Sequence, residues 1–143
     1  MSDDLDGVLE DYHHALDAFM RGDCESAKAL YSQRDDVTLG NPFGPFARGR
    51  HQVVDTMRRA AANYRDGEAV GFDAISKYVT ADLAYVVEVE RLRSKVGGRQ
   101  DVVPVTLRVT SVFRREDGRW KLVHRHADPI TAPRSADSVL QPR

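Results

Sequence analysis

The segment LRVTSVFRREDGRWKLVHRHAD, residues 107–128, contains two strand-like runs joined by a tight turn. Apolar and polar residues alternate on both sides of Asp117-Gly118, where both residues tolerate the positive φ of a two-residue hairpin turn. The segment therefore predicts a β-hairpin. Alternation of the same kind predicts four consecutive strands, at residues 70–74, 83–93, 101–115 and 119–128.

Apolar residues recur at helical spacing in the part of the chain that precedes the strands. Within residues 2–23 they form a single stripe, made of Leu5, Val8, Leu9, Tyr12, Leu16, Phe19 and Met20. Ser2 or Asp3 is the expected N-cap of this helix, and Gly22 is its expected stop. The pattern predicts an amphipathic helix with one face in the core.

Two further helices are expected, a short one after Asp23 and a longer one between Gly49 and Gly67. Helices that come first and strands that follow predict an α+β fold, with an antiparallel sheet folded over the helices. Long strands in a small domain must curve, and a curved sheet covered by helices encloses a cavity. Cavities of this kind commonly hold small ligands.

The composition is that of one globular domain without a strong charge bias. The chain has 143 residues and a net charge of -1, which gives no electrostatic reason to expect a nucleic acid or a membrane surface as a partner. A single cysteine excludes an internal disulfide. The N-terminus is acidic and lacks the features of a signal peptide, so we expect a cytoplasmic protein. We expect one domain over residues 1–128, and an extended or disordered tail over residues 129–143.

The loop TLGNPFGPFARGR, residues 38–50, lies between the second and third expected helices. With this loop, the order of helices and strands resembles the nuclear transport factor 2-like superfamily over residues 5–128. The hairpin is especially similar to small bacterial members described as SnoaL-like or ketosteroid isomerase-like. The resemblance implies a cone-shaped, curved antiparallel or mixed sheet packed on N-terminal helices, which is a cystatin-like fold.

The resemblance does not extend to the catalytic acids of ketosteroid isomerases. In those enzymes an aspartate directly before the PFG sequence moves the proton, and here that position is Asn41, whose amide is no base. The position of their second acid corresponds to Ser111. Ketosteroid isomerase chemistry is therefore not expected. Asn41 before Pro42 is also a common way to open a turn.

The last strand presents two faces. Simple alternation places Trp120, Leu122, His124 and His126 on one face, and Lys121, Val123, Arg125 and Ala127 on the other. The resemblance places Ser111 in the cavity, and with it Arg125. The histidines then lie on the convex face near Arg108 and Thr110, with Glu88 and Glu90 as further charges. There we expect an interface first, a metal site on His124 and His126 second, and a catalytic dyad last.

The polar residues expected around the cavity are Tyr12, Asn41, Tyr85, Ser111 and Arg125. Either tyrosine could equally be a core aromatic residue. Arg125 inside a cavity needs an anionic partner, either a protein carboxylate or an acidic ligand, and we expect the acidic ligand.

These considerations predict a protein that binds an anionic or aromatic small molecule without a cofactor, with isomerase, cyclase or hydrolase activity left open. The alternative is a non-catalytic dimerisation or association module. A homodimer is expected because Val112, Trp120 and Leu122 would make the outer face of the sheet partly apolar.

Overall fold

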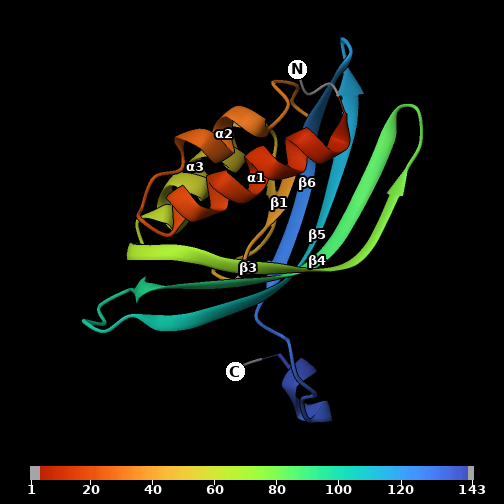
Figure 1. Cartoon of the computed structure of the whole chain (residues 1–143). Coiled ribbons are helices and arrows are strands. Elements are labelled where there is room, and N and C mark those ends of the chain that lie inside the picture. Colours follow the sequence, from red (N-terminus) through yellow and green to blue (C-terminus); the bar gives the residue numbers. More distant parts are fainter. Residues whose placement is uncertain (1–3, 142–143) are drawn as a thin grey trace.

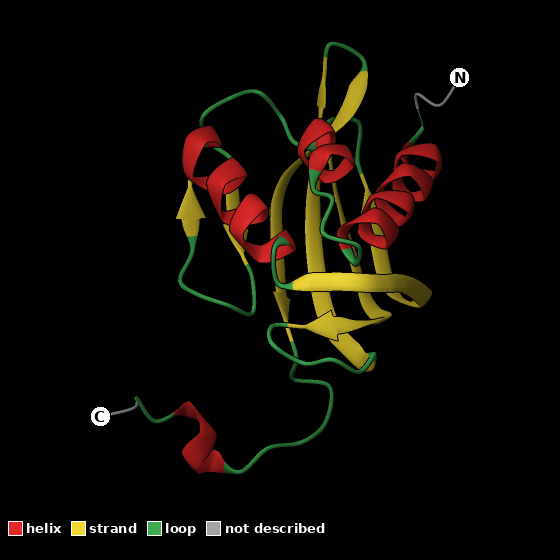
Figure 2. Ribbon diagram, turned by 90° about the vertical axis from the view of Figure 1, so that its left-hand side faces the viewer, coloured by secondary structure: helices red, strands yellow, loops and turns green. Residues whose placement is uncertain are grey.

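The computed structural model describes residues 4–141. Helices α1 to α3 lie on one side of a curved sheet, as Figures 1 and 2 show from two directions. The elements are α1 (Leu5–Phe19), α2 (Glu25–Leu30), β1 (Thr38–Gly40), β2 (Ala47–Arg48), α3 (Arg50–Ala61), β3 (Tyr64–Val79), β4 (Leu83–Val96), β5 (Val103–Glu116), β6 (Arg119–Asp128) and a 3-10 helix (Ala136–Val139). The predicted α+β class is confirmed.

The sheet is mixed and has the strand order β2-β1-β6-β5-β4-β3. Strands β3 to β6 form an antiparallel meander, whereas β1 pairs with β6 in parallel. The turn between β5 and β6 has φ values of 51° at Asp117 and 78° at Gly118, as the sequence predicts. The long strands bend around α1, so their inner faces and the helices enclose the core (Figure 1).

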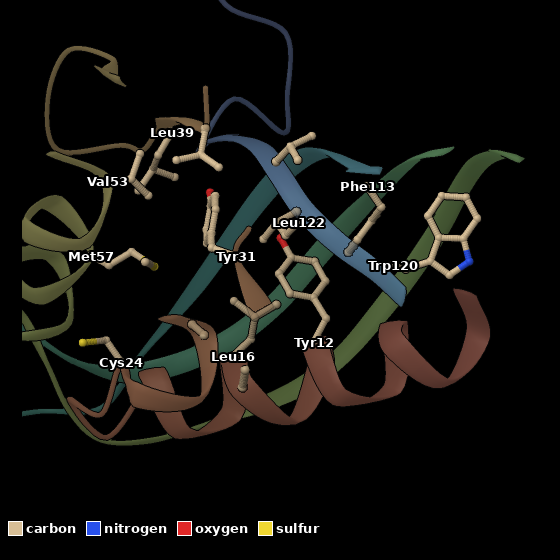
Figure 3. Close-up of a cluster of buried hydrophobic side chains, with 14 of the residues drawn as sticks. Tyr12, Leu16, Cys24, Tyr31, Leu39, Val53, Met57, Phe113, Trp120 and Leu122 are labelled. Atoms are coloured by element: carbon tan, nitrogen blue, oxygen red, sulfur yellow. The ribbon is translucent and has the colours of Figure 1, made fainter. Parts of the chain in front are cut away.

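The apolar stripe of α1 faces this core. Tyr12, Ala15 and Leu16 are buried against the sheet, as Figure 3 shows for the two labelled members, Tyr12 and Leu16. The N-cap is Asp4, whose carboxylate accepts a hydrogen bond from the Gly7 amide at 2.9 Å. The predicted caps, Ser2 and Asp3, lie outside the described residues.

The third helix is shorter than predicted. It ends at Ala61, and Gly67 lies in strand β3, where its N–H donates to the Met20 carbonyl at 3.1 Å. A Cβ at Gly67 would overlap the Arg93 carbonyl oxygen on β4. Glycine is therefore required here by the close approach of two backbones, and the expectation that it stops a helix is wrong.

A β-bulge interrupts the alternation of β6. Val112 pairs with His124 while the next residue, Phe113, pairs with Leu122, so Val123 has no partner in the register. Before the bulge, Trp120 and Leu122 face the core, where Figure 3 shows them, and after it Arg125 and Ala127 do. Simple alternation therefore assigned Trp120 and Leu122 to the wrong face. Two of the three residues expected to make the outer face apolar are core residues.

The chain after Asp128 leaves the domain (Figure 1). Residues 131–141 are exposed, and their one regular element is the 3-10 helix. None of the described helices is long and apolar enough to cross a membrane.

Candidate functional site

An internal cavity of about 50 Å³ lies between the helices and the inner face of the sheet. Its lining is Tyr12, Leu16, Phe19, Met20, Ala27, Tyr31, Leu39, Asn41, Pro42, Phe43, Met57, Ala60, Tyr64, Leu92, Leu107, Leu122 and Arg125. Most of these side chains are apolar. Among the described residues, no Asp, Glu or His belongs to the lining.

The polar end of the cavity is a hydrogen-bonded cluster of four side chains. Arg125 donates to the Tyr12 hydroxyl at 2.5 Å and to both carboxylate oxygens of Glu90, at 2.6 and 2.8 Å. The Tyr12 and Ser111 hydroxyl oxygens are 2.8 Å apart. The structure thus brings together Tyr12, Ser111 and Arg125 and adds Glu90, but only Tyr12 and Arg125 line the cavity. The expected place of Ser111 in the lining is wrong, because its hydroxyl is turned to the Tyr12 hydroxyl.

Glu90 supplies the anionic partner that Arg125 requires. Its side chain is 0% exposed and reaches Arg125 from β4 in a bidentate pair, the strongest geometry for this contact. The sequence left two possible partners for Arg125, a protein carboxylate or an acidic ligand, and the structure contains the protein carboxylate. Glu88 and Glu90 also face the helices, so their expected place on the convex face is wrong.

Burial and charge shape the ionisation of this cluster. Burial raises the pKa of Tyr12 to about 12, although the Arg125 charge opposes the shift. Burial alone would lower the pKa of Arg125, but the Glu90 carboxylate and the Tyr12 phenol raise it well above its usual value. At neutral pH the cluster therefore consists of a neutral phenol beside a charge-compensated ion pair.

Asn41 lies at the mouth of the cavity and opens a turn there. Its side-chain oxygen accepts a hydrogen bond from the Phe43 amide at 3.0 Å. Both readings of the sequence therefore describe part of its role, because Asn41, Pro42 and Phe43 also line the cavity.

Tyr85 does not belong to the cavity. It is 40% exposed on the outer face of β4 and stacks on Tyr78 of β3, with ring centroids 5.9 Å apart. The even-numbered neighbours, Ala84 and Val86, are the ones that face the core. The predicted cavity role of Tyr85 is wrong because the strand presents its other face to the helices.

His124 and His126 lie on the outer face of β6, as predicted. The Nδ1 atom of His124 lies 2.7 Å from the Thr38 hydroxyl, and His126 is next to Phe46, with ring centroids 5.7 Å apart. Burial, followed by the neighbouring His126, lowers the pKa of His124. In residues 4–141 no group of three or more His, Cys, Asp or Glu side chains could hold a metal ion, which gives the metal alternative no support.

A sequence profile described as the SnoaL-like domain matches residues 8–132, which is most of the chain. The protein belongs to the SnoaL-like domain family. This match confirms the resemblance found in the hairpin and loop. No curated protein matches the chain.

Solved structures agree with this family. A proposed dehydratase of the nuclear transport factor 2-like family from Streptomyces avermitilis is 27% identical, with a TM-score of 0.73 and coverage of 90% of this chain and 94% of that one. A ketosteroid isomerase-like protein from Erwinia carotovora atroseptica is 19% identical (TM-score 0.72, coverage 90% and 95%). A proposed calcium/calmodulin-dependent protein kinase type II association domain from Thiobacillus denitrificans is 21% identical (TM-score 0.70, coverage 89% and 95%). The last two show the fold alone.

The SnoaL-like domain has a second buried carboxylate contact that the sequence reading missed. His13 of α1 lies within 2.9 and 3.1 Å of the two Glu88 oxygens, and its ring stacks on Phe72 of β3 at 3.7 Å. This contact joins α1 to the sheet beside the cavity. It was missed because alternating valines and glutamates in β4 are equally compatible with either face being buried.

Proposed function

We propose that this SnoaL-like protein binds a small, neutral and mainly apolar molecule, aromatic or cyclic, in its cone. A carbonyl or hydroxyl oxygen of the ligand accepts a hydrogen bond from Tyr12. The observation that carries the proposal is the Glu90–Arg125 ion pair, which places a charge-compensated polar group at the end of an apolar cavity. The anionic ligand expected from the sequence loses its rationale, because Arg125 already has a carboxylate partner.

The hydrogen-bond directions support Tyr12 as the donor to the ligand. Arg125 donates to the Tyr12 oxygen, which leaves the phenolic proton for Ser111 or for an acceptor in the cavity. Tyr12 lines the cavity and Ser111 does not. A carbonyl oxygen beside Tyr12 and Arg125 would also be polarised by them.

Binding is favoured over catalysis by the composition of the lining. Within the described residues it holds no carboxylate or imidazole that could take a proton from the ligand, and both Glu90 oxygens are engaged by Arg125. Because the chain is similar to a proposed dehydratase, catalytic activity on such a ligand should be assayed as well. The proposal itself concerns recognition.

A matched set of naphthalene compounds tests the proposal by calorimetry. Acetylnaphthalene carries a neutral acceptor, ethylnaphthalene has none, and naphthoate is anionic. We expect the ketone to bind about 2- to 10-fold more tightly than the hydrocarbon, the range of one net hydrogen bond, and the preference to disappear in Tyr12→Phe. Tightest binding of naphthoate, or an unchanged preference in Tyr12→Phe, would refute the proposal.

A second candidate function is association with another copy of the chain through the outer face of the sheet. Tyr78, Tyr85, Val112 and His124 follow one another across four strands in register, and Tyr78 and Tyr85 are exposed. An exposed, stacked aromatic pair on a sheet face is typical of an interaction surface. The fold shared with a proposed kinase association domain is compatible with this role.

A further inference from the structure

We propose that the ligand site has a second half outside the cavity, and that the Phe43 side chain separates the two halves. The outer half is the groove between the loop at residues 41–46 and helix α3. This inference rests on the proposed function, since it concerns the ligand that Tyr12 holds. The inference specifies how that ligand enters the cavity and what shape it has.

The inner cavity is too small for the proposed ligand, so the ligand site needs a second half. A cavity of about 50 Å³ has room for a few water molecules. Sites for organic ligands span roughly 300–1,000 Å³, so the inner cavity alone is too small for an aromatic ring system. The outer groove measures about 510 Å³. Together the two spaces reach the size of an ordinary ligand site.

Phe43 is the residue placed between them. It lines both the cavity and the groove, as do Asn41 and Ala60. Its ring contacts Tyr64 on the cavity side, with centroids 5.8 Å apart, and the side chain is 49% exposed. Movement of this one half-exposed ring would join the two spaces, without any change in the helices or the sheet.

The backbone of the loop is held on both sides of Gly44, so the Phe43 side chain is the part proposed to move. The Asn41 side-chain oxygen accepts a hydrogen bond from the Phe43 amide at 3.0 Å, and the Phe46 ring lies against His124 and His126. Phe46 also lines the outer groove. A Cβ at Gly44 would meet no atom within 4 Å, so the space beside Gly44 is open. Rotation of the half-exposed Phe43 ring therefore needs no movement of the loop backbone.

The outer groove is lined by polar side chains, and the arginine among them is paired with an aspartate. Arg59 is paired with Asp55 at 3.1 Å, so the arginine is already compensated. The remaining polar side chains of the groove are Asn41, His51, Gln52, Thr56 and Asn63. A matching ligand is elongated, with one acceptor at its inner end beside Tyr12, an apolar ring that takes the position of the displaced Phe43 side chain, and an uncharged hydrogen-bonding group at its outer end.

Stopped-flow binding of prodan, a neutral fluorescent naphthyl ketone, tests the gate in wild type, Phe43→Ala and the control variant Ile75→Ala. Ile75 is an exposed apolar residue of β3 that lines neither the cavity nor the groove. We expect Phe43→Ala to raise the association rate constant about tenfold or more, because the wild type must first move the ring. Ile75→Ala should stay within about twofold of wild type. Equal effects of both variants, or no effect of Phe43→Ala, would overturn the gate.

The outer half is tested with a second ligand pair, acetylnaphthalene and a derivative that carries a hydroxyethoxy group on the distal ring. The derivative should bind about 2- to 10-fold more tightly, and Thr56→Val should reduce that gain. Absence of a gain in wild type would remove the outer half. A rate effect at Phe43 with no effect of Tyr12→Phe would instead refute the proposed function alone, and no prodan binding by wild type or Phe43→Ala would refute both.

Discussion

Arg125 of β6 and Glu90 of β4 form a bidentate ion pair inside the domain, and Glu90 has no exposed surface. The two residues lie on different strands with β5 between them, so the arginine side chain reaches across the inner face of the sheet. This pair neutralises the polar end of the cavity. It also makes that end sensitive to the loss of either partner.

Replacement of Glu90 by Gln should destabilise the protein by about 3–5 kcal/mol, because it leaves the Arg125 charge buried without a counter-ion. The apolar double variant Glu90→Leu/Arg125→Met should lose less, since both charges are gone. Urea unfolding at neutral pH measures both values. A double variant that is less stable than Glu90→Gln would show that the pair does more than compensate its own charges.

Gly67→Ala should destabilise the protein by about 1–3 kcal/mol, the usual range for overpacking, because the added methyl group meets the Arg93 backbone of the neighbouring strand. Gly98→Ala is the matched control, as a Cβ there meets nothing within 4 Å. Thermal unfolding of the two variants compares them directly. Similar midpoints for both would mean that β3 and β4 are not held as close together as the structure has them.

Stability should fall at high pH. The pKa of Tyr12 and of Tyr64 is raised from 10.0 to about 12, and that of Tyr31 is also raised, mainly because burial disfavours each phenolate. Between pH 10 and 12 the unfolded chain therefore loses protons that the folded chain keeps. The free energy of unfolding then decreases as pH rises, by about 1.4 kcal/mol for each unit of pKa shift.

Urea unfolding at several pH values across this window measures the slope. Tyr64→Phe removes one of the shifted groups and should make the slope shallower, with little change in stability below pH 10. A slope that is the same in this variant and in wild type would contradict the assignment.

Tyr85→Glu tests the outer face as a contact between two copies of the chain. A charge in place of the stacked ring should shift the protein toward the monomer, because a carboxylate in an apolar interface loses its hydration. Sedimentation velocity over a range of concentrations reports the change. Ser26→Glu on α2, an exposed position on the helical side, is the control. A wild type that stays monomeric at all concentrations would exclude this interface.

The architecture could be predicted from the sequence because its signals are local. The period of the apolar residues separates helices from strands, and Asp117-Gly118 fixes a hairpin register. Which face of each strand is buried could be predicted less well from the sequence. The bulge at Val123 reverses the alternation of β6, and no local signal marks it, since its cause is the register with β5.

The candidate site was predicted in part for a related reason. Tyr12 and Arg125 line the cavity, whereas Ser111 contacts Tyr12 without lining it, Tyr85 faces outward, and Glu90 lies inside the domain and not on the convex face. Buried carboxylates in a strand have the same sequence pattern as exposed ones. Only the three-dimensional partner, here Arg125, shows that Glu90 belongs inside.

The central claim is that Tyr12 donates a hydrogen bond to a neutral ligand oxygen in the cavity. The most direct measurement is the NMR chemical shift of the carbonyl carbon of isotopically labelled acetylnaphthalene bound to the protein. A bound signal shifted downfield relative to the ligand in an apolar solvent, and returned toward that value in Tyr12→Phe, is the predicted result. A bound carbonyl signal that is identical in wild type and Tyr12→Phe would contradict the account.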